Sequence, residues 1–176
     1  MALPFDISEK GQRSLRRGRQ SLSGAAYFLT MCTERRNRGL ENESVTASLL
    51  DHAQHIDGGW SLRSAVIMPD HVHLLVDLMA SNSLSEVVRL FKGRTSVVLR
   101  RHAMKWQPGY FDHRLRTAED LLPIFLYIFL NPYRVGLMPQ DQRWPGYFCS
   151  PDDWVWFEHL PAIHCHFPNG WSLIAA

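Results

Sequence analysis

Hydrophobic residues recur along the chain with the two periods that distinguish strands from helices. Three segments rich in β-branched and aromatic residues predict strands, at residues 25–34 (AAYFLTMCTE), 60–68 (WSLRSAVIM) and 72–79 (VHLLVDLM). The last two are joined only by a tight PDHV connection, which predicts an antiparallel hairpin. Residues 109–116 (GYFDHRLR) predict a fourth strand or an extended edge segment.

Two segments in the first part of the chain carry apolar residues at helical spacing. Residues 44–56 predict a helix that begins behind Ser44 as its N-cap and closes at a Gly-Gly pair. Residues 83–103 predict an amphipathic helix with one basic face and a Ser-x-x-Glu capping box that begins at Ser83. We expect this second helix to be interrupted or weakened at Gly93.

A third helix is predicted over residues 118–131, with acidic residues in its first turn. We expect Asn131-Pro132 to end or kink it, because a residue before proline is pushed out of the helical region. The element order β-α-β-β-α-(β)-α predicts an α+β fold, a ferredoxin-like sandwich in which helices pack on an antiparallel sheet, with N- and C-terminal extensions. The expected organisation is a basic N-terminal arm, one catalytic domain and a C-terminal tail of unknown role, at residues 1–23, 24–147 and 148–176.

Basic residues are concentrated in two segments, although the formal net charge is only +2. Residues 10–38 carry eight cations against one acid, and residues 89–116 carry another eight against one acid. Sixteen of the 19 cations are arginine, whose planar donor fork matches phosphate geometry. This charge pattern favours a polyanionic partner, above all nucleic acid, over arginines that merely cover solvated faces.

Other features of the sequence exclude several classes of protein. No window approaches the roughly 18 uninterrupted apolar residues of a membrane-spanning helix. The N-terminal residues contain no apolar signal-peptide region, so we expect a protein that is not secreted. The three widely spaced cysteines, Cys32, Cys149 and Cys165, argue against a disulfide framework and favour a cytoplasmic location.

Two histidines interrupt the hydrophobic strand MPDHVHLLVDL. Side chains alternate across a strand, so His71 and His73 share one face, about 6.6 Å apart along the strand. The opposite face is uniformly apolar and is expected to be core, which predicts that the histidines line an exposed surface or a cleft. Both imidazoles can converge on one small ion. The alternative is a pair of half-buried, hydrogen-bonded side chains.

The third predicted helix supplies two further candidates. Tyr127 and Asn131 stand four residues apart and therefore share a helical face, with side chains about 5–6 Å apart. Taken alone, a tyrosine in an apolar helix is by default a core residue, and an asparagine before proline is by default a cap.

Taken together, these motifs resemble a known family. MPDHVHLLV followed by LYIFLNPYRVGL is similar to the single-tyrosine HUH transposases, and specifically to the REP-associated tyrosine transposases. The segments GRQSLSGAAYFLTMCTERR and WQPGYFDHRLRTAED also resemble that group, so the likeness extends over about residues 18–146.

The resemblance implies the roles of the candidate residues. His71 and His73 correspond to the metal-binding histidines, Tyr127 to the nucleophile, and Asn131 to the polar residue that helps complete the metal site. The implied activity is metal-dependent cleavage and joining of single-stranded DNA that folds into hairpins, through a covalent 5′-phosphotyrosine. Imidazole ligands alone favour zinc, iron or nickel, whereas the family implies Mg²⁺ or Mn²⁺.

Basic residues are the candidates for holding the DNA. They are Arg16, Arg17, Arg19, Arg35, Arg36, Lys92, Arg94, Arg114, Arg116 and Arg134. Because tyrosine is a weak nucleophile at neutral pH, metal or a nearby arginine such as Arg114, Arg116 or Arg134 is needed to favour the phenolate.

Two other functions and a second histidine pair stay open at this point. One alternative is a non-catalytic module that binds single-stranded nucleic acid on the same fold, and the other is a zinc hydrolase. His164 and His166 form a second His-x-His pair, which lies between prolines with no predicted strand to direct both rings. The chain is expected to act as a monomer or a homodimer.

Overall fold

The computed structural model describes residues 21–79, 83–116, 121–139 and 141–157. Over these residues one antiparallel sheet is formed by the strands β1 (Ala26–Cys32), β2 (Trp60–Met68), β3 (His71–Leu78), β4 (Phe111–Arg114) and β5 (Tyr147–Cys149). The helices are α1 (Glu43–Gln54), α2 (Leu84–Arg101), α3 (Leu121–Arg134) and α4 (Pro151–Phe157), with a short 3₁₀ turn, η2 (Glu34–Arg36).

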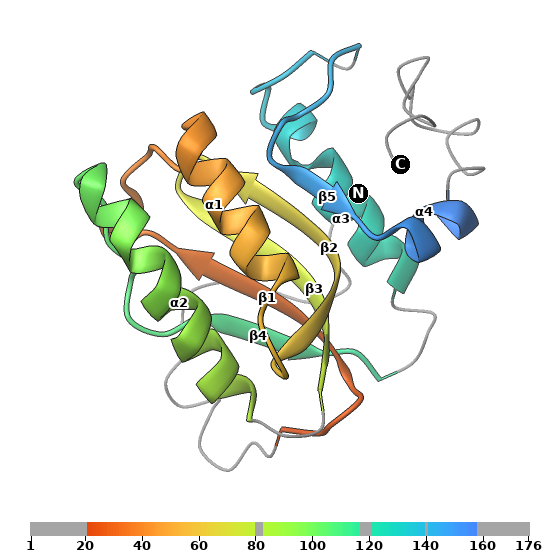
Figure 1. The fold of residues 1–176 in the computed structure, drawn as a ribbon. Helices are drawn as coiled ribbons and strands as arrows, with labels where there is room; N and C mark the ends of the chain where they lie inside the picture. The colour runs from red at the N-terminus through yellow and green to blue at the C-terminus, as the bar shows by residue number, and fades with distance from the viewer. Residues whose placement is uncertain (1–20, 80–82, 117–120, 140, 158–176) are drawn as a thin grey trace.

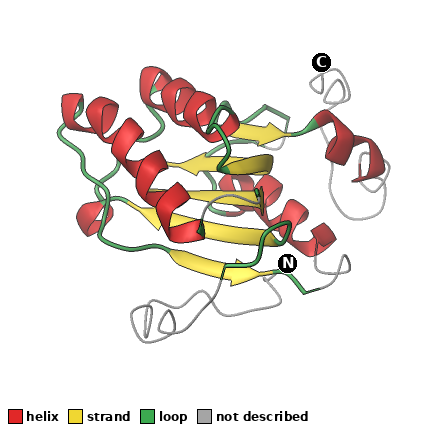
Figure 2. Ribbon diagram, turned by 60° about the horizontal axis from the view of Figure 1, so that its bottom comes forward, coloured by secondary structure: helices red, strands yellow, loops and turns green. Residues whose placement is uncertain are grey.

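The order of strands across the sheet is β4-β1-β3-β2-β5, so β3 lies at the centre. The first four strands and the two helices between them follow the β-α-β-β-α-β pattern of a ferredoxin-like sandwich. Helices α1 and α2 lie side by side on one face of the sheet, and α3 lies on the other (Figures 1 and 2). The predicted α+β fold class is therefore confirmed.

The face of β3 without histidines forms the larger core, as the sequence predicts. Val72, Leu74 and Val76 are fully buried and pack with residues of α1 and α2. Burial of each such side chain contributes about 1.5–3 kcal/mol of transfer free energy, so this face fixes the register of β3 against β1 and β2.

The histidine face of β3 is also covered, so of the two predicted alternatives, an exposed surface or a cleft, the exposed surface is wrong. On this face Phe28 and Leu75 are fully buried against Ile124 and Ile128 of α3. The exposed alternative fails because α3 covers the second face of the sheet, and the histidines line a cleft instead. The histidines therefore lie beneath a helix, at the margin of a second core.

The helix boundaries differ from the prediction in three places. Helix α3 does not end at Asn131-Pro132 but runs on to Arg134. Pro132 is buried inside the helix, although it lacks the backbone N–H that would donate one helical hydrogen bond. Helix α2 is continuous through Gly93, which faces open space. The N-cap of helix α1 is Asn42, two residues before the predicted Ser44, and its side chain accepts a hydrogen bond from the backbone N–H of Ser44. The Ser83 capping box is present as predicted.

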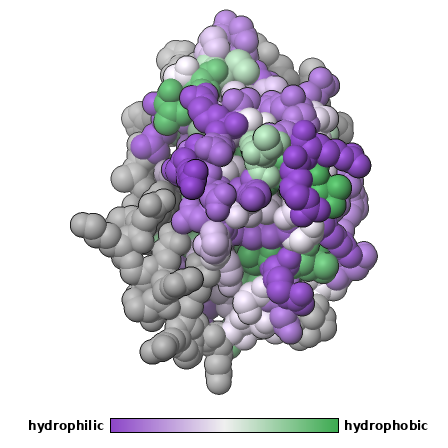
Figure 3. Space-filling view, turned by 90° about the vertical axis from the view of Figure 1, so that its left-hand side faces the viewer, coloured by the Kyte–Doolittle hydropathy of each residue, from purple (hydrophilic) through white to green (hydrophobic). Residues whose placement is uncertain are grey.

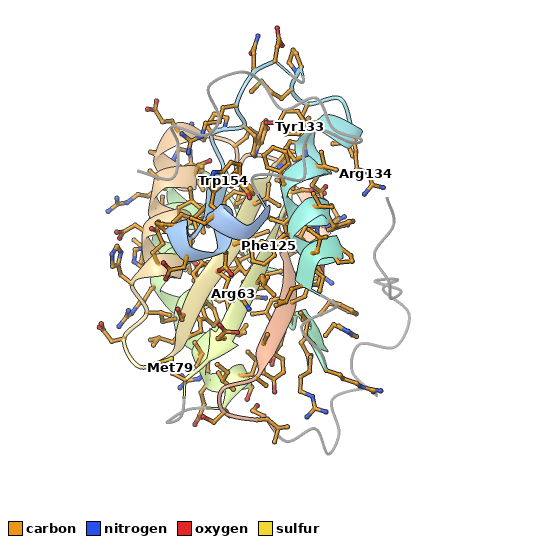
Figure 4. The ribbon with its side chains drawn as sticks, turned by 90° about the vertical axis from the view of Figure 1, so that its right-hand side faces the viewer. Arg63, Met79, Phe125, Tyr133, Arg134 and Trp154 are labelled. Carbon is orange, nitrogen blue, oxygen red and sulfur yellow. The ribbon has the colours of Figure 1, made fainter. Side chains whose placement is uncertain are left out.

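Residues 147–157, where the sequence predicts no element, add an edge strand and a helix to the sheet. Strand β5 pairs with β2, and α4 follows immediately after it. Arg63 of β2 donates two charge-assisted hydrogen bonds from Nε to the Asp153 carboxylate, both at 3.1 Å, and its guanidinium lies 5.5 Å above the ring of Phe125. Figure 4 shows Arg63 on the sheet next to α4, and this ion pair fixes α4 to the sheet.

The exposed side of α2 is predominantly hydrophilic. Figure 3 shows this side of the molecule with separate hydrophobic areas among polar ones, and Leu90 and Val97 are 39% and 47% exposed. Arg89, Arg94, Arg100 and Arg101 are also exposed on α2. The basic face predicted for this helix is therefore present.

Candidate active site

The central strand β3 holds the two histidines between β1 and β2. In the register with β1, His73 lies opposite Thr30 and His71 lies opposite Cys32. The side chain of His73 is 1% exposed, whereas His71 is half-buried at the strand end. Because β3 is hydrogen-bonded to a strand on each side, the backbone that carries the two histidines is held in place.

Each imidazole has a polar partner at Nδ1 and directs Nε2 towards the other. His71 Nδ1 lies 2.6 Å from Asp70 Oδ1, and His73 Nδ1 lies 2.8 Å from Thr30 Oγ1. The two Nε2 atoms are 3.1 Å apart. In proteins, a metal-binding histidine is commonly oriented by a carboxylate or another polar group that hydrogen-bonds to the ring nitrogen that does not bind the metal.

Burial and local interactions shift the pKa values of His73 and of the neighbouring Asp70. Burial, the neighbouring His71 and Arg36 together hold the pKa of His73 well below its usual value. The hydrogen bond from His71, followed by the charges of His71 and Arg36, lowers the pKa of the Asp70 carboxyl. His73 is therefore neutral and Asp70 is ionised near pH 7, which are the protonation states that metal binding requires.

Helix α3 brings Tyr127 and Asn131 against the histidines. The ring centroids of Tyr127 and His73 are 5.3 Å apart, with an edge-to-face orientation, and Phe28 packs against both rings. The guanidinium of Arg134 lies 5.6 Å from the Tyr127 ring centroid. Asn131 is 8% exposed, and its Nδ2 has no hydrogen-bond partner. An unsatisfied buried donor is costly in a folded protein, so the Nδ2 group of Asn131 is available to a hydrogen-bond acceptor such as a phosphate oxygen.

These side chains surround a single cavity of about 220 Å³. One wall contains His71, His73, Tyr127 and Asn131. The opposite wall is the loop of residues 107–110 before β4, which Lys92 holds by donating hydrogen bonds from Nζ to the backbone carbonyls of Gln107 and Gly109. The cavity also includes Thr30, Cys32, Arg36 and Phe111.

The spacing of the two imidazole nitrogens fits an octahedral divalent ion. An octahedral ion with ligands at about 2.1 Å separates adjacent donors by about 3.0 Å, close to the 3.1 Å between the two Nε2 atoms. Within the described part of the chain no group of three or more His, Cys, Asp and Glu residues could hold a metal. The amide oxygen of Asn131 is one of the oxygen donors among the cavity residues that could join the two imidazoles, and other positions are left for water and phosphate oxygens.

The basic residues predicted to bind DNA occupy different environments. Arg16, Arg17 and Arg19 lie outside the described residues, as do His164 and His166. Arg35, Arg94, Arg114, Arg116 and Arg134 are exposed. Lys92 supports the cavity loop from behind, and Arg36 is ion-paired with Asp70 at 3.1 Å. Of the predicted cations, Arg36 lines the cavity itself, and Lys92 and Arg134 contact residues of its wall.

Sequence reasoning missed two contributors to this site. Thr30 is a polar residue within a hydrophobic strand, and its position opposite His73 becomes apparent only when β1 is paired with β3. The loop 107–110 lies within the segment WQPGYFDHRLRTAED that carries the resemblance, but its place beside Tyr127 was not predicted. Its proximity to Tyr127 follows from the tether to α2 and from the antiparallel bridge between Thr33 and Trp106.

Comparison with known proteins assigns the family. A family model described as "Transposase IS200 like" matches residues 21–128, more than half of the chain. The chain therefore belongs to the IS200-like transposases, enzymes that cleave and join DNA. The matched segment includes both histidines and Tyr127 and ends before Asn131.

Relatives with curated descriptions are more specific. The chain is 26% identical over 135 residues to the REP-associated tyrosine transposase of Escherichia coli (strain K12), which covers 72% of this chain and 78% of that protein. It is 22% identical over 143 residues to a protein of Haemophilus influenzae described as a putative REP-associated tyrosine transposase, covering 72% and 81%. The likeness to this group inferred from the sequence is thus confirmed.

A solved structure shares the fold. It is described as a REP-associated tyrosine transposase bound to a REP hairpin, and it matches with a TM-score of 0.57 and 22% identity over 69% of this chain and 74% of that one. In the described parts of the present chain no helix is long and apolar enough to cross a membrane.

Proposed function

We propose that the protein is a metal-dependent endonuclease and strand transferase that acts on hairpin-forming single-stranded DNA through a 5′-phosphotyrosine on Tyr127. The observation that carries this proposal is the convergence of Tyr127, His71 and His73 on one cavity, although they come from opposite layers of the domain. A tyrosine, two imidazoles with facing nitrogens and a buried amide are the parts that such a reaction needs.

In this proposal His71 Nε2, His73 Nε2 and the amide oxygen of Asn131 hold a divalent ion, Mg²⁺ or Mn²⁺. When bound, such an ion polarises the scissile phosphate and stabilises the charge that builds on its oxygens. The hard amide oxygen and the positions left for water favour these two metals over zinc, which prefers closed nitrogen and sulfur sites.

Tyr127 then attacks phosphorus. A bond forms between the tyrosyl oxygen and phosphorus, the bond to the 3′ oxygen breaks, and the leaving strand ends in a 3′ hydroxyl after taking up a proton. Arg134, whose guanidinium lies over the Tyr127 ring, favours the phenolate by its positive charge. The reverse attack by the 3′ hydroxyl of another strand releases Tyr127 and joins DNA.

The hairpin substrate is supported by the relatives and by charge. A structural relative is described as bound to a REP hairpin, and the two curated relatives are named for REP association. The exposed arginines of α2 and of the segment that follows β4 provide donors for a phosphate backbone. Single-stranded bases beside the scissile phosphate would then meet Tyr110 and Phe111 on the cavity wall.

The test is a cleavage assay with an end-labelled REP-type hairpin. We expect products and a denaturation-resistant protein-DNA adduct with Mg²⁺ or Mn²⁺, neither with EDTA, and neither with Tyr127→Phe. Tyr133→Phe is the matched control, because Tyr133 lies on the same helix but donates its hydroxyl to the Gln142 carbonyl and is absent from the cavity. Hairpin binding without cleavage by the unmodified chain would instead indicate a non-catalytic binding module.

A further inference from the structure

Asp70 stands between a histidine of the site and an arginine. Its Oδ1 lies 2.6 Å from His71 Nδ1, and its Oδ2 lies 3.1 Å from Arg36 Nε. The backbone carbonyl of Asp70 accepts from both the N–H and the hydroxyl of Thr33. The residue is therefore fixed through its backbone, and each of its carboxylate oxygens faces one donor.

Arg36 reaches Asp70 from a strained turn. Arg35 and Arg36 have φ values of 55° and 56°, in the left-handed region that non-glycine residues seldom occupy. Consecutive residues in this region cost free energy and persist where the surrounding structure holds them, which is common at functional sites. Here the turn directs Nε of Arg36 to Asp70 and its Nη1 to the sulfur of Cys32, at 2.8 Å.

We propose that Asp70 is the positioning residue of the site: it keeps the proton of His71 on Nδ1, so that Nε2 stays free for the metal, and Arg36 fixes the carboxylate in this role. The role of Arg36 is thus distinct from the DNA contact predicted for it. This inference rests on the proposed function, because a free Nε2 matters only if His71 binds a metal. The position of the proton on the His71 ring can be measured in the metal-free protein.

An asparagine at position 70 distinguishes this role from simple packing. Asparagine has one carbonyl oxygen, whereas the aspartate serves two donors with two oxygens. The arginine is always a donor and takes that oxygen, so the amide NH₂ faces His71 Nδ1 and donates to it. His71 must then carry its proton on Nε2, the atom that would bind the metal.

The experiment records nitrogen-15 spectra of histidine rings in the full chain, treated with EDTA at a pH of about 8, where imidazoles are neutral. The His71 signals are assigned by their loss in His71→Gln. We expect Nδ1–H in the unmodified protein, Nε2–H in Asp70→Asn, and Nδ1–H again in the double variant Arg36→Ala/Asp70→Asn, where the amide is free to turn its oxygen to His71. The exposed Asp57→Asn serves as the matched control and leaves the pattern unchanged.

Manganese affinity gives the second readout. We expect Asp70→Asn to weaken Mn²⁺ binding by about 10- to 100-fold, as loss of an outer-shell partner does, and the double variant to recover most of that loss. A proton on Nε2 of His71 in the unmodified protein, or one that stays on Nδ1 in Asp70→Asn, would overturn the inference. If the proton moves as expected but the unmodified chain binds no Mn²⁺, the positioning role holds and the proposed metal site fails.

Discussion

The ring of Tyr127 meets the ring of His73 edge to face, with 5.3 Å between their centroids. One ring comes from the helix that covers the sheet and the other from the central strand, so their contact depends on correct packing of the two layers. His73 is itself held between Phe28, which stacks on it at 5.2 Å, and Thr30. Packing of α3 on the sheet therefore fixes the positions of both the proposed nucleophile and the proposed metal-binding histidines.

Removing either histidine should abolish metal-dependent cleavage but affect stability unequally. His73→Ala leaves a cavity beside Phe28 and is expected to lower the free energy of unfolding by about 2–4 kcal/mol. His71→Ala removes a ring at the strand end that is 14% exposed and hydrogen-bonded to Asp70, and should lower it by about 1–2 kcal/mol. Urea unfolding and Mn²⁺ calorimetry of both variants test this. Equal destabilisation with retained Mn²⁺ binding would contradict the assigned positions.

Asn131→Leu should separate activity from stability. The amide Nδ2 of Asn131 is buried without a partner, so replacing the side chain by an apolar one of similar volume removes an unsatisfied group. We expect the free energy of unfolding to stay the same or to rise by up to about 1 kcal/mol, while Mn²⁺ affinity and cleavage fall at least about tenfold. A loss of more than about 2 kcal/mol would mean that the amide has a structural partner instead.

Arg134 should act on the rate of cleavage rather than on the fold. Its side chain is exposed on the last turn of α3 (Figure 4), and its guanidinium lies 5.6 Å from the centroid of the Tyr127 ring. We expect Arg134→Ala to slow single-turnover cleavage by about 10- to 100-fold, with Lys restoring part of the rate because the charge remains. The exposed Arg89→Ala on α2 is the control. Equal rates for the two alanine variants would remove Arg134 from the mechanism.

Asp153→Ala should loosen the C-terminal helix without affecting the site. It leaves the largely buried guanidinium of Arg63 without its main partner, and the hydrogen bond and charge of Asp153 are what raise the pKa of Arg63. Breaking such a pair costs about 3–5 kcal/mol when fully buried, and we expect about 2–4 kcal/mol here because Arg63 keeps Asp77 at 3.8 Å. Hydrogen exchange should increase in α4 while Mn²⁺ affinity is unchanged. Loss of Mn²⁺ binding would show that α4 supports the cavity.

The sequence predicts the first four strands and the first three helices because their hydrophobic periods are strong. It fails where tertiary packing overrides a local rule. Pro132 is accepted inside α3 because the helix is held on both sides of it by the second core, and Gly93 leaves α2 intact because it faces solvent. Strand β5 is three residues long and pairs only at the sheet edge, so no period could reveal it.

The candidate site shows the same division. Alternation along the strand predicts that His71 and His73 share one face of β3, and helical spacing predicts that Tyr127 and Asn131 share one face of α3. Neither pattern predicts that these two faces contact each other. That step came from the family resemblance, and the structure brings all four residues into one cavity. The hydrogen bonds of Thr30 and Asp70 depend on strand register and rotamer, which a single sequence does not specify.

Mapping the covalent linkage tests the central claim most directly. The chain is incubated with hairpin DNA and Mn²⁺, the adduct is digested with nuclease and trypsin, and the modified residue is located by tandem mass spectrometry. The tryptic peptide 117–134 contains both Tyr127 and Tyr133, so fragmentation between them is decisive. We predict a nucleotide phosphate on Tyr127 alone. A phosphate on Tyr133 or on any other residue, or cleavage that leaves no adduct at all, would contradict the account.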